Sequence, residues 1–291
     1  MHYKTVNGIL SNDNTMNLYR GCQHGCIYCD TRSACYHHDH EFEDIQVKEN
    51  ALVLLENCLK HKKTKCMIQM GSMCDPYMSL EKELQHVNKA LKLIDKYNFG
   101  ITFTTKSDLV LRDLSLLKRI NDKTKCVVQI SLTTYDDELC KKLEPNVCPT
   151  SRRIEVLKEL NKNNIPTIVW LTPILPFIND NKENIEKLLD ACIEAKVKGI
   201  ICFGMSVTLR EGSREYYYQQ LDKLYPNLKD KYQEIYKDQY TLNSPNNREL
   251  MNLLFNKCQE NNIMCNYSEI FAYLQEFEEK KTTGFEQLSL F

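Results

Sequence analysis

The sequence predicts an α/β fold in which helices cover a largely parallel sheet. Two observations support this. Short apolar runs rich in β-branched residues alternate with segments of helical periodicity, and the runs are nearly continuous in apolar residues, as in strands buried on both faces. The runs are Cys66–Met70, Gly100–Thr104, Cys126–Leu132, Thr167–Leu171 and Gly199–Phe203.

A sixth, weaker strand fits Asn14–Tyr19, ahead of a helix around Ala51–Leu59. Between the next two strands, one apolar helix face is formed by Leu84, Val87, Leu91 and Ile94. Six strand–helix units are too few for a complete eight-unit barrel but enough for a partial (β/α)6 TIM-like barrel. A flat, doubly wound sheet is the alternative, and periodicity alone does not separate the two.

Polar residues follow every predicted strand. The segments are the cysteine loop after the first strand, then 72–75, 104–107, 131–134, 172–176 and 206–210. The carboxyl ends of parallel strands meet on one face, which carries the active site in such folds. We therefore expect all six segments to line one opening of the barrel, at the carboxyl ends of its strands.

The periodicity changes near residue 210, which suggests three parts. Residues 1–210 are predicted to form the partial barrel, and residues 211–275 a C-terminal helical extension packed on it. The polar stretch 276–291 is predicted to be a mobile tail.

The composition limits the possible environments and partners. Lys and Arg number 38 against 39 Asp and Glu, so the net charge of −1 gives no general attraction to nucleic acid. No apolar run approaches the roughly 18–20 residues of a membrane span, and the N-terminus lacks the apolar core of a signal peptide. We expect a cytoplasmic protein whose 14 cysteines are thiols or metal ligands.

Three cysteines are concentrated in one loop. Cys22, Cys26 and Cys29 have the spacing C-x3-C-x2-C, which can ligate three irons of a 4Fe–4S cluster and leave the fourth iron open. An open iron can chelate S-adenosylmethionine, and one electron then releases a 5′-deoxyadenosyl radical. The alternative is zinc, with a fourth ligand from Cys35, His37, His38 or His40.

The cysteine loop, with Tyr28 inside it, resembles the radical S-adenosylmethionine (radical SAM) superfamily. The segments 75–77 (Asp-Pro-Tyr) and 173–176 (Pro-Ile-Leu-Pro) resemble its spore photoproduct lyase-like branch, also called DNA repair photolyase-like. The resemblance covers about residues 14–205. It implies a partial (β/α)6 barrel, a 4Fe–4S cluster, S-adenosylmethionine and an electron donor such as flavodoxin or ferredoxin.

The resemblance also implies roles for four residues around the cofactor. Ser72 would contact the methionine amino group, and Lys106 would pair with the carboxylate as a point charge. Ser131 would contact the ribose or carboxylate, and Tyr28 would pack beside the adenine. Each of these residues could instead serve as a strand-end cap or turn residue.

Cys74 follows the second main strand, where spore photoproduct lyase carries a cysteine that returns a hydrogen atom to its product radical. A thiol S–H is weak enough for this reaction, although Cys74 could equally be a small lining residue. The sequence departs from the lyase at Asp30, where the lyase has a second tyrosine. This departure concerns the lyase reaction itself, not the superfamily chemistry.

The last five residues resemble the pentapeptide by which bacterial polymerases and repair proteins bind the replicative sliding clamp. Leu288, Leu290 and Phe291 would fill apolar pockets, and Gln287 would hydrogen-bond at the rim. Such a tether would bring a near-neutral protein to DNA without a basic surface. The alternative is a tail that docks on the barrel.

Three functions remain open on the sequence. The first is a lyase-like radical enzyme that repairs or modifies DNA and is recruited by the sliding clamp. The second is a radical enzyme that modifies a peptide, RNA or small molecule. The third is a non-catalytic, metal-binding clamp adaptor that keeps the fold.

Overall fold

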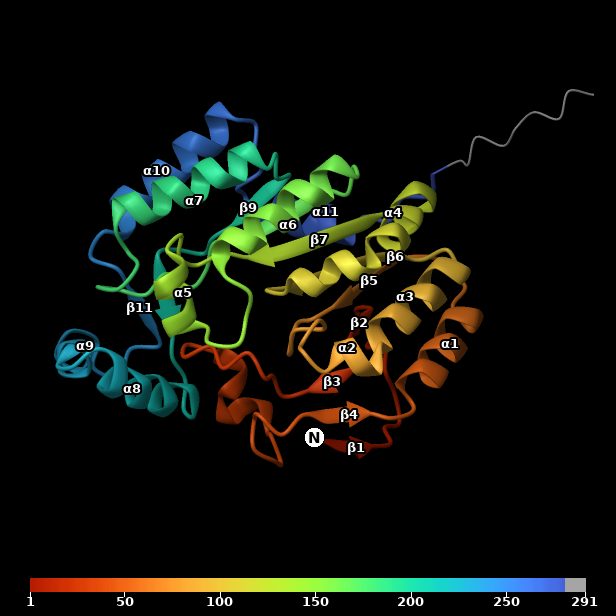
Figure 1. The fold of residues 1–291 in the computed structure, drawn as a ribbon, viewed down its shortest axis with the longest axis horizontal. Coiled ribbons are helices and arrows are strands. Elements are labelled where there is room, and N and C mark those ends of the chain that lie inside the picture. The colour runs from red at the N-terminus through yellow and green to blue at the C-terminus, as the bar shows by residue number, and fades with distance from the viewer. Residues whose placement is uncertain (281–291) are drawn as a thin grey trace, which may run out of the picture.

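The computed structural model describes residues 1–280, and its centre is a six-stranded parallel sheet (Figure 1). The strands lie in the order β2-β5-β6-β7-β8-β9, which is also their order along the chain. A doubly wound sheet reverses its strand order at a switch point, so that alternative is wrong. The partial (β/α)6 barrel is confirmed. Its strands are β2 (Thr15–Met16), β5 (Met67–Met70), β6 (Gly100–Thr105), β7 (Cys126–Ser131), β8 (Thr167–Trp170) and β9 (Gly199–Ile201).

Helices connect these strands and cover the outer face of the sheet (Figure 1). They are α1 (Ala51–His61), α2 (Glu81–Leu84), α3 (His86–Lys96), α4 (Leu114–Lys123), α5 (Asp137–Leu143), α6 (Thr150–Lys162) and α7 (Lys182–Glu194). Three short 3-10 helices are η1 (Asp30–Arg32), η2 (Ala34–Tyr36) and η3 (Asp108–Asp113). The helix predicted from the face beginning at Leu84 is interrupted, because Gln85 has a φ of 53° and separates α2 from α3.

The two faces of the sheet are buried against different partners. Val128, Val169 and Ile200 belong to the large core that the outer helices share. Their strand neighbours Val127, Ile168 and Ile201 point to the other face, since side chains alternate along a strand. There they pack on Ile270 and Leu274 of the last helix, α11 (Tyr267–Gln275). The inner face of the barrel is therefore partly filled by the C-terminal helix.

Two smaller sheets lie outside the barrel. One joins β1 (His2–Lys4), β4 (Gln46–Lys48) and β3 (Tyr19–Arg20). The other joins β10 (Ser206–Thr208) to β11 (Thr241–Asn243) as an antiparallel pair. The strand predicted over 14–19 is thus divided: β2 enters the main sheet and β3 leaves it for the N-terminal sheet.

Residues 211–280 are mainly helical. In addition to α11 they contain α8 (Ser213–Leu224), α9 (Leu228–Tyr236) and α10 (Asn247–Glu260), and α10 packs beside α7 (Figure 1). Strand β11 interrupts this segment, which the helical prediction did not include. No helix among residues 1–280 is both long and apolar enough to cross a membrane.

Residues 276–280, predicted to begin the mobile tail, are held against the barrel. Glu278 forms an ion pair with the buried Lys125 at 2.7 Å, and the backbone N–H of Lys280 donates to the carbonyl of Lys123 at 2.9 Å. This part of the tail is therefore not a free segment. The sliding-clamp-like residues Gln287, Leu288, Leu290 and Phe291 lie outside the described residues.

Candidate active site

A cavity of about 150 Å³ opens at the carboxyl ends of β5, β6 and β7. It brings together the cysteine loop and the segments predicted to line one opening of the barrel after these three strands. The predicted site residues in its wall are Cys22, Cys26, Cys29, Ser72, Cys74, Lys106 and Ser131.

The cysteine loop needs glycine where it turns. Gly21 has a φ of +85°, and a Cβ there would lie 2.4 Å from the carbonyl oxygen of Phe42. Burial raises the pKa of the Cys22 thiol to about 12, while backbone N–H groups of Asp75 and His24 favour its thiolate. Burial also raises the pKa of Cys26 well above its usual value, although the charge of Lys106 opposes this.

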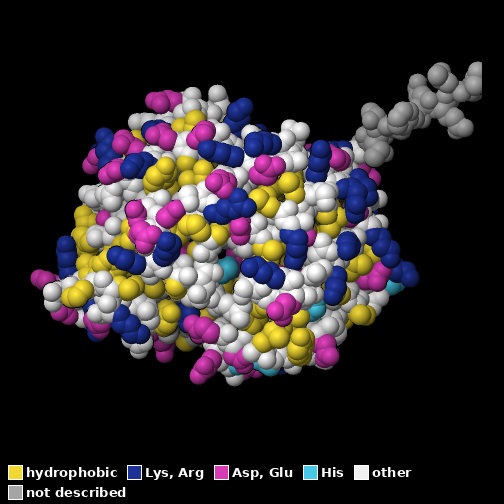
Figure 2. Space-filling view, viewed as in Figure 1, with side chains coloured by type: hydrophobic (Ala, Val, Ile, Leu, Met, Phe, Trp, Pro, Cys, Tyr) yellow, Lys and Arg dark blue, Asp and Glu magenta, His cyan; other side chains and the backbone are white. Residues whose placement is uncertain are grey.

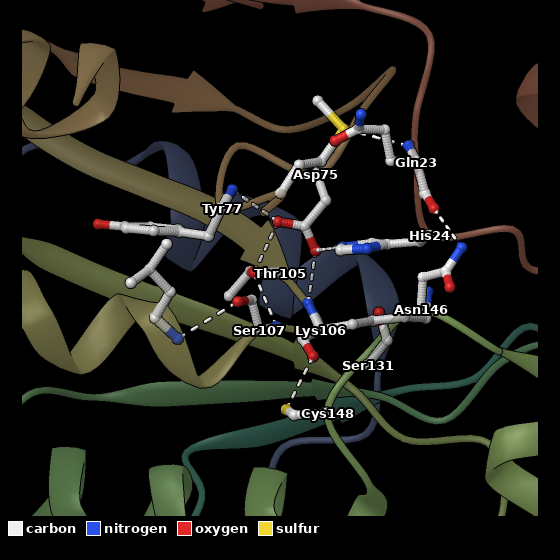
Figure 3. Close-up of polar contacts among 12 residues, drawn as sticks. Gln23, His24, Asp75, Tyr77, Thr105, Lys106, Ser107, Ser131, Asn146 and Cys148 are labelled. Atoms are coloured by element: carbon white, nitrogen blue, oxygen red, sulfur yellow. Dashed lines mark hydrogen bonds and ion pairs between the residues drawn. The ribbon is translucent and has the colours of Figure 1, made fainter. Parts of the chain in front are cut away.

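Asp75 links the cysteine loop to the ends of β5 and β6 (Figure 3). One carboxylate oxygen accepts hydrogen bonds from the Tyr77 backbone N–H at 2.8 Å and from the Thr105 hydroxyl at 2.7 Å. The other accepts from the Lys106 backbone N–H at 2.7 Å and lies 2.8 Å from Nε2 of His24. Burial raises the pKa of Asp75, but these partners, His24 first, hold it below its usual value.

A second buried cluster supports the loop from the other side. Glu144 and Arg153 form an ion pair in which both side chains are fully buried. Arg153 also donates to the carbonyl of Ser131 at 2.7 Å, and Glu144 accepts a hydrogen bond from the hydroxyl of Tyr28. Burial raises the pKa of Glu144, but the charges of Arg153 and Lys106 lower it below its usual value.

Lys106 points its ammonium group toward the cysteines. Burial lowers the pKa of Lys106, but Cys26 and Glu144 raise it by more. Among residues 1–280, its Nζ has no hydrogen-bond or ion-pair partner, although it lies 5.9 Å from the centre of the Tyr28 ring. The group can therefore meet an anionic ligand in the cavity.

The segment after β5 is positioned by Asn17. Its amide Nδ2 donates to the hydroxyl of Ser72 at 3.2 Å, and its Oδ1 accepts from the Met73 backbone N–H at 3.2 Å. The Cys74 thiol donates to the carbonyl of Tyr19 at 3.3 Å. Burial, with the charge of Asp75, raises the pKa of Cys74 to about 12, so it stays protonated at neutral pH.

Tyr28 is the predicted cofactor residue that the cavity wall does not include. Its ring is buried in a core shared with Leu143 and Tyr217, and its hydroxyl donates a hydrogen bond to the carboxylate of Glu144. The structure thus gives Tyr28 a role in packing beneath the site. Its contact with the adenine stays a prediction.

The residues of the zinc alternative lie away from the cavity. Cys35 contacts Arg210 at 3.5 Å, His38 bonds to the carbonyl of Thr31, and His40 bonds to that of Glu41. Within residues 1–280, no three His, Cys, Asp or Glu side chains converge closely enough to hold a single metal ion. None of the Cys35, His38 and His40 side chains is among the residues that line the cavity with Cys22, Cys26 and Cys29.

Comparison with known proteins decides the family. The model of the radical SAM superfamily matches residues 16–192, more than half of the chain.

The chain belongs to the radical SAM superfamily.

Two proteins that are similar in sequence over more than half of this chain are both named as uncharacterized. The chain is 35% identical to the uncharacterized protein MJ0683 of Methanocaldococcus jannaschii over 167 residues, 57% of this chain and 61% of that protein. It is 26% identical to the uncharacterized protein Rv2578c of Mycobacterium tuberculosis over 234 residues, 77% of this chain and 67% of that protein. The chain therefore spans less than two thirds of the first of these relatives.

Solved structures show the same fold. A spore photoproduct lyase variant with bound AdoMet and dinucleoside spore photoproduct matches with a TM-score of 0.61 at 13% identity, over 84% of this chain and 73% of that one. The radical SAM methyltransferase TsrM of Kitasatospora setae matches with a TM-score of 0.52 at 12% identity, over 72% and 37%. At these identities the likeness concerns the fold.

The superfamily's cofactors, a 4Fe–4S cluster and S-adenosylmethionine, fit the residues present. Three cysteines from one loop line a single cavity, and Lys106, whose ammonium group has no hydrogen-bond or ion-pair partner among residues 1–280, lies in the same wall. Bound there, the two cofactors supply a carbon-centred radical that abstracts hydrogen. Cys22, Cys26 and Cys29 are the residues that would hold the cluster, and the carbonyl of Tyr19 accepts the thiol hydrogen of Cys74.

Four residues of this radical SAM site whose side chains are buried were not assigned a role from the sequence: His24, Asp75, Glu144 and Arg153. Of these four, only His24 and Asp75 lie in segments on which the resemblance rests, the cysteine loop and the Asp-Pro-Tyr of residues 75–77. His24 lies inside the cysteine loop and Asp75 follows β5, whereas Glu144 directly follows α5 and Arg153 lies within α6, so nothing local in the sequence links these two to the site. Buried charges in native proteins are normally paired.

The cluster ligands can be tested by substitution. Replacing Cys22, Cys26 or Cys29 with Ala should abolish the 4Fe–4S absorption and the iron content of anaerobically reconstituted protein, since each removes one thiolate. Cys35→Ala and Cys74→Ala are matched controls that should retain about four irons per chain. Loss of iron in Cys35→Ala equal to that in Cys26→Ala would exclude the three-thiolate site.

The Glu144–Arg153 pair can be tested by urea unfolding. Arg153→Met leaves Glu144 buried without its partner and should cost about 3–5 kcal/mol of unfolding free energy. The adjacent Arg152, whose side chain is 42% exposed and pairs with Asp108 and Glu155, should cost less than about 1 kcal/mol when changed to Met. Adding Glu144→Gln to Arg153→Met should restore part of the loss. Equal costs at positions 152 and 153 would contradict the buried pair.

Proposed function

We propose that this radical SAM enzyme acts on DNA, by lesion reversal of the spore photoproduct lyase type or a related base modification. The observation that carries the proposal is the composition of one cavity. It joins the three cysteines to Lys106 and, on its opposite loop, to the protonated thiol of Cys74. In this proposal Cys74 would donate a hydrogen atom to the substrate radical beside the site that generates it.

The cofactor roles follow from the same cavity. Lys106 is the cation available to the cofactor carboxylate, and the Ser72 hydroxyl, held by Asn17, is available to its amino group. Ser131 lies at the end of β7 for the ribose or carboxylate. An electron donor such as flavodoxin or ferredoxin would reduce the cluster.

Two features support DNA as the substrate. The fold is shared with a spore photoproduct lyase whose structure holds a dinucleoside spore photoproduct. The C-terminal pentapeptide resembles a sliding-clamp motif. Asp30 differs from the lyase: it accepts a hydrogen bond from Tyr36 at 2.9 Å and lies 3.3 Å from Arg210, so a related base modification is proposed alongside lesion reversal.

The distribution of surface charge bears on how the protein would reach DNA. On the face in Figure 2, Lys and Arg side chains are interspersed with Asp and Glu rather than gathered into one broad basic area. A near-neutral protein of this kind gains little non-specific affinity from phosphates. We propose that the bacterial sliding clamp supplies the local concentration instead.

Lys106→Ala should weaken S-adenosylmethionine binding by about one to two decades, the loss expected for a hydrogen bond to a charged group. Iron content should stay unchanged. Cofactor affinity is measured by equilibrium dialysis under anaerobic conditions, with Lys92→Ala, an exposed lysine on α3, as the control. An unaltered affinity in Lys106→Ala would remove this residue from the site.

The substrate class is tested with reconstituted enzyme, ultraviolet-damaged DNA and S-adenosylmethionine deuterated at the 5′ carbon. The expected result is a changed base whose mass reveals transfer to or from the cofactor. Cys74→Ala should still cleave the cofactor but give a different product, because no thiol quenches the substrate radical. Identical products would reduce Cys74 to a lining residue, and no change in any DNA would reject the DNA proposal.

Clamp recruitment is tested with a peptide of residues 278–291. It should bind a bacterial sliding clamp in the micromolar range, about 8 kcal/mol, by isothermal titration calorimetry. Leu290→Ala with Phe291→Ala should abolish binding, because buried anchors dominate such contacts. In the full-length protein the same change should leave cofactor cleavage intact. A wild-type protein that does not bind the clamp would refute this part of the proposal.

A further inference from the structure

Four aromatic side chains gather at the carboxyl ends of β8 and β9, and we call them the aromatic platform: Trp170, Phe203, Tyr267 and Phe271. The ring centre of Phe203 lies 6.0 Å from that of Trp170, 5.7 Å from Tyr267 and 6.3 Å from Phe271. The rings of Phe203 and Phe271 are nearly parallel, at 23°. Phe203 is 58% exposed and Tyr267 is 53% exposed. Two rings of the platform are thus largely open to solvent.

The platform adjoins the cofactor cavity. Ser131, in the cavity wall, is the register partner of Trp170 on the next strand. Gln129 and Ser131 point to the same face, because side chains alternate along β7, and Gln129 accepts a hydrogen bond from Nε1 of Trp170 at 2.7 Å. Neighbouring strands are about 4.8 Å apart. The platform therefore begins one strand from the wall of the cavity.

Hydrogen bonds fix two parts of the platform, the indole of Trp170 and the start of α11. Gln129, which accepts the hydrogen bond from the indole of Trp170, itself donates one to the Thr102 hydroxyl at 2.8 Å. The indole is therefore fixed by contacts that span β6, β7 and β8. On the other side, the Asn266 side chain caps α11 by accepting from the Ser268 N–H at 2.9 Å, which fixes the helix start at Tyr267. Rigid exposed rings beside a catalytic cavity suit a flat aromatic ligand, which can stack on them.

We propose that the aromatic platform stacks a nucleobase of the DNA substrate, unpaired or flipped out of the helix, beside the cofactor cavity. This inference rests on the proposed function in DNA modification. Stacking requires no positive charge, because every base has a π face, and it suits a protein with a net charge of −1. It also agrees with chemistry on a base, which must leave the stack to reach a catalytic site.

The test measures binding by the reconstituted holoenzyme saturated with S-adenosylmethionine. The probes are a fluorescein-labelled oligothymidylate of about twelve nucleotides and an abasic strand of equal length and charge. Anisotropy gives the affinity, and the emission of Trp170, the chain's only tryptophan, reports contact with the platform. We expect the oligothymidylate to bind and quench Trp170, and the abasic strand to bind at least about tenfold more weakly.

The variants separate ring stacking from apolar packing. Phe203→Leu with Tyr267→Leu should weaken oligothymidylate binding about tenfold or more. Phe203→Tyr with Tyr267→Phe should preserve binding, as should Phe255→Ala, which removes an exposed ring on α10. Iron content and the thermal midpoint verify that each variant is folded.

Three outcomes would overturn the platform. Equal binding by wild type and the leucine variant would reject it and leave the DNA function standing. Failure of wild type to bind either strand would reject the platform, whereas the DNA function is rejected separately by the absence of any changed base in the deuterium experiment. Quenching of Trp170 by S-adenosylmethionine alone, lost in the leucine variant, would assign the platform to the cofactor's adenine.

Discussion

The site depends on one buried carboxylate, that of Asp75. Three segments distant in sequence must meet there: the cysteine loop, the loop after β5 and the end of β6. Each contributes a contact to Asp75, through His24, Tyr77 and Thr105 with Lys106. A buried charge is costly unless it is paired and hydrogen-bonded, so this group favours only the arrangement in which all partners are present. The cysteine loop is thereby held against the carboxyl ends of β5 and β6.

The Glu144–Arg153 pair complements Asp75 from the opposite side of the loop. It anchors Tyr28, inside the cysteine loop, and the carbonyl of Ser131 at the end of β7. Lys106 stands between the two groups with its ammonium toward the cysteines, and Glu144 helps to keep it charged. The loop is thus positioned by two buried carboxylates, and among residues 1–280 the ammonium group of Lys106 in the cavity wall has no hydrogen-bond or ion-pair partner.

Much of this arrangement could be predicted from local sequence patterns. The β-branched runs are buried on both faces, so they located the five main strands, and the C-x3-C-x2-C spacing located the candidate cluster ligands. Patterns of this kind do not encode long-range partners, so the pairing of His24 with Asp75 was not foreseen. Gln85 breaks a helix through a positive φ that its residue type does not signal. Strand β11 is only three residues long and depends on pairing with β10.

The central claim is that Asp75 positions the cysteine loop at the carboxyl ends of β5 and β6. It is tested most directly by electron paramagnetic resonance of the reduced cluster in Asp75→Asn. Asn keeps the size of the side chain but removes the charge that pairs with His24. The account predicts full iron content and a cluster signal that shifts only at S-adenosylmethionine concentrations about tenfold or more above those needed by wild type. A signal that shifts at the wild-type concentration in Asp75→Asn would contradict it.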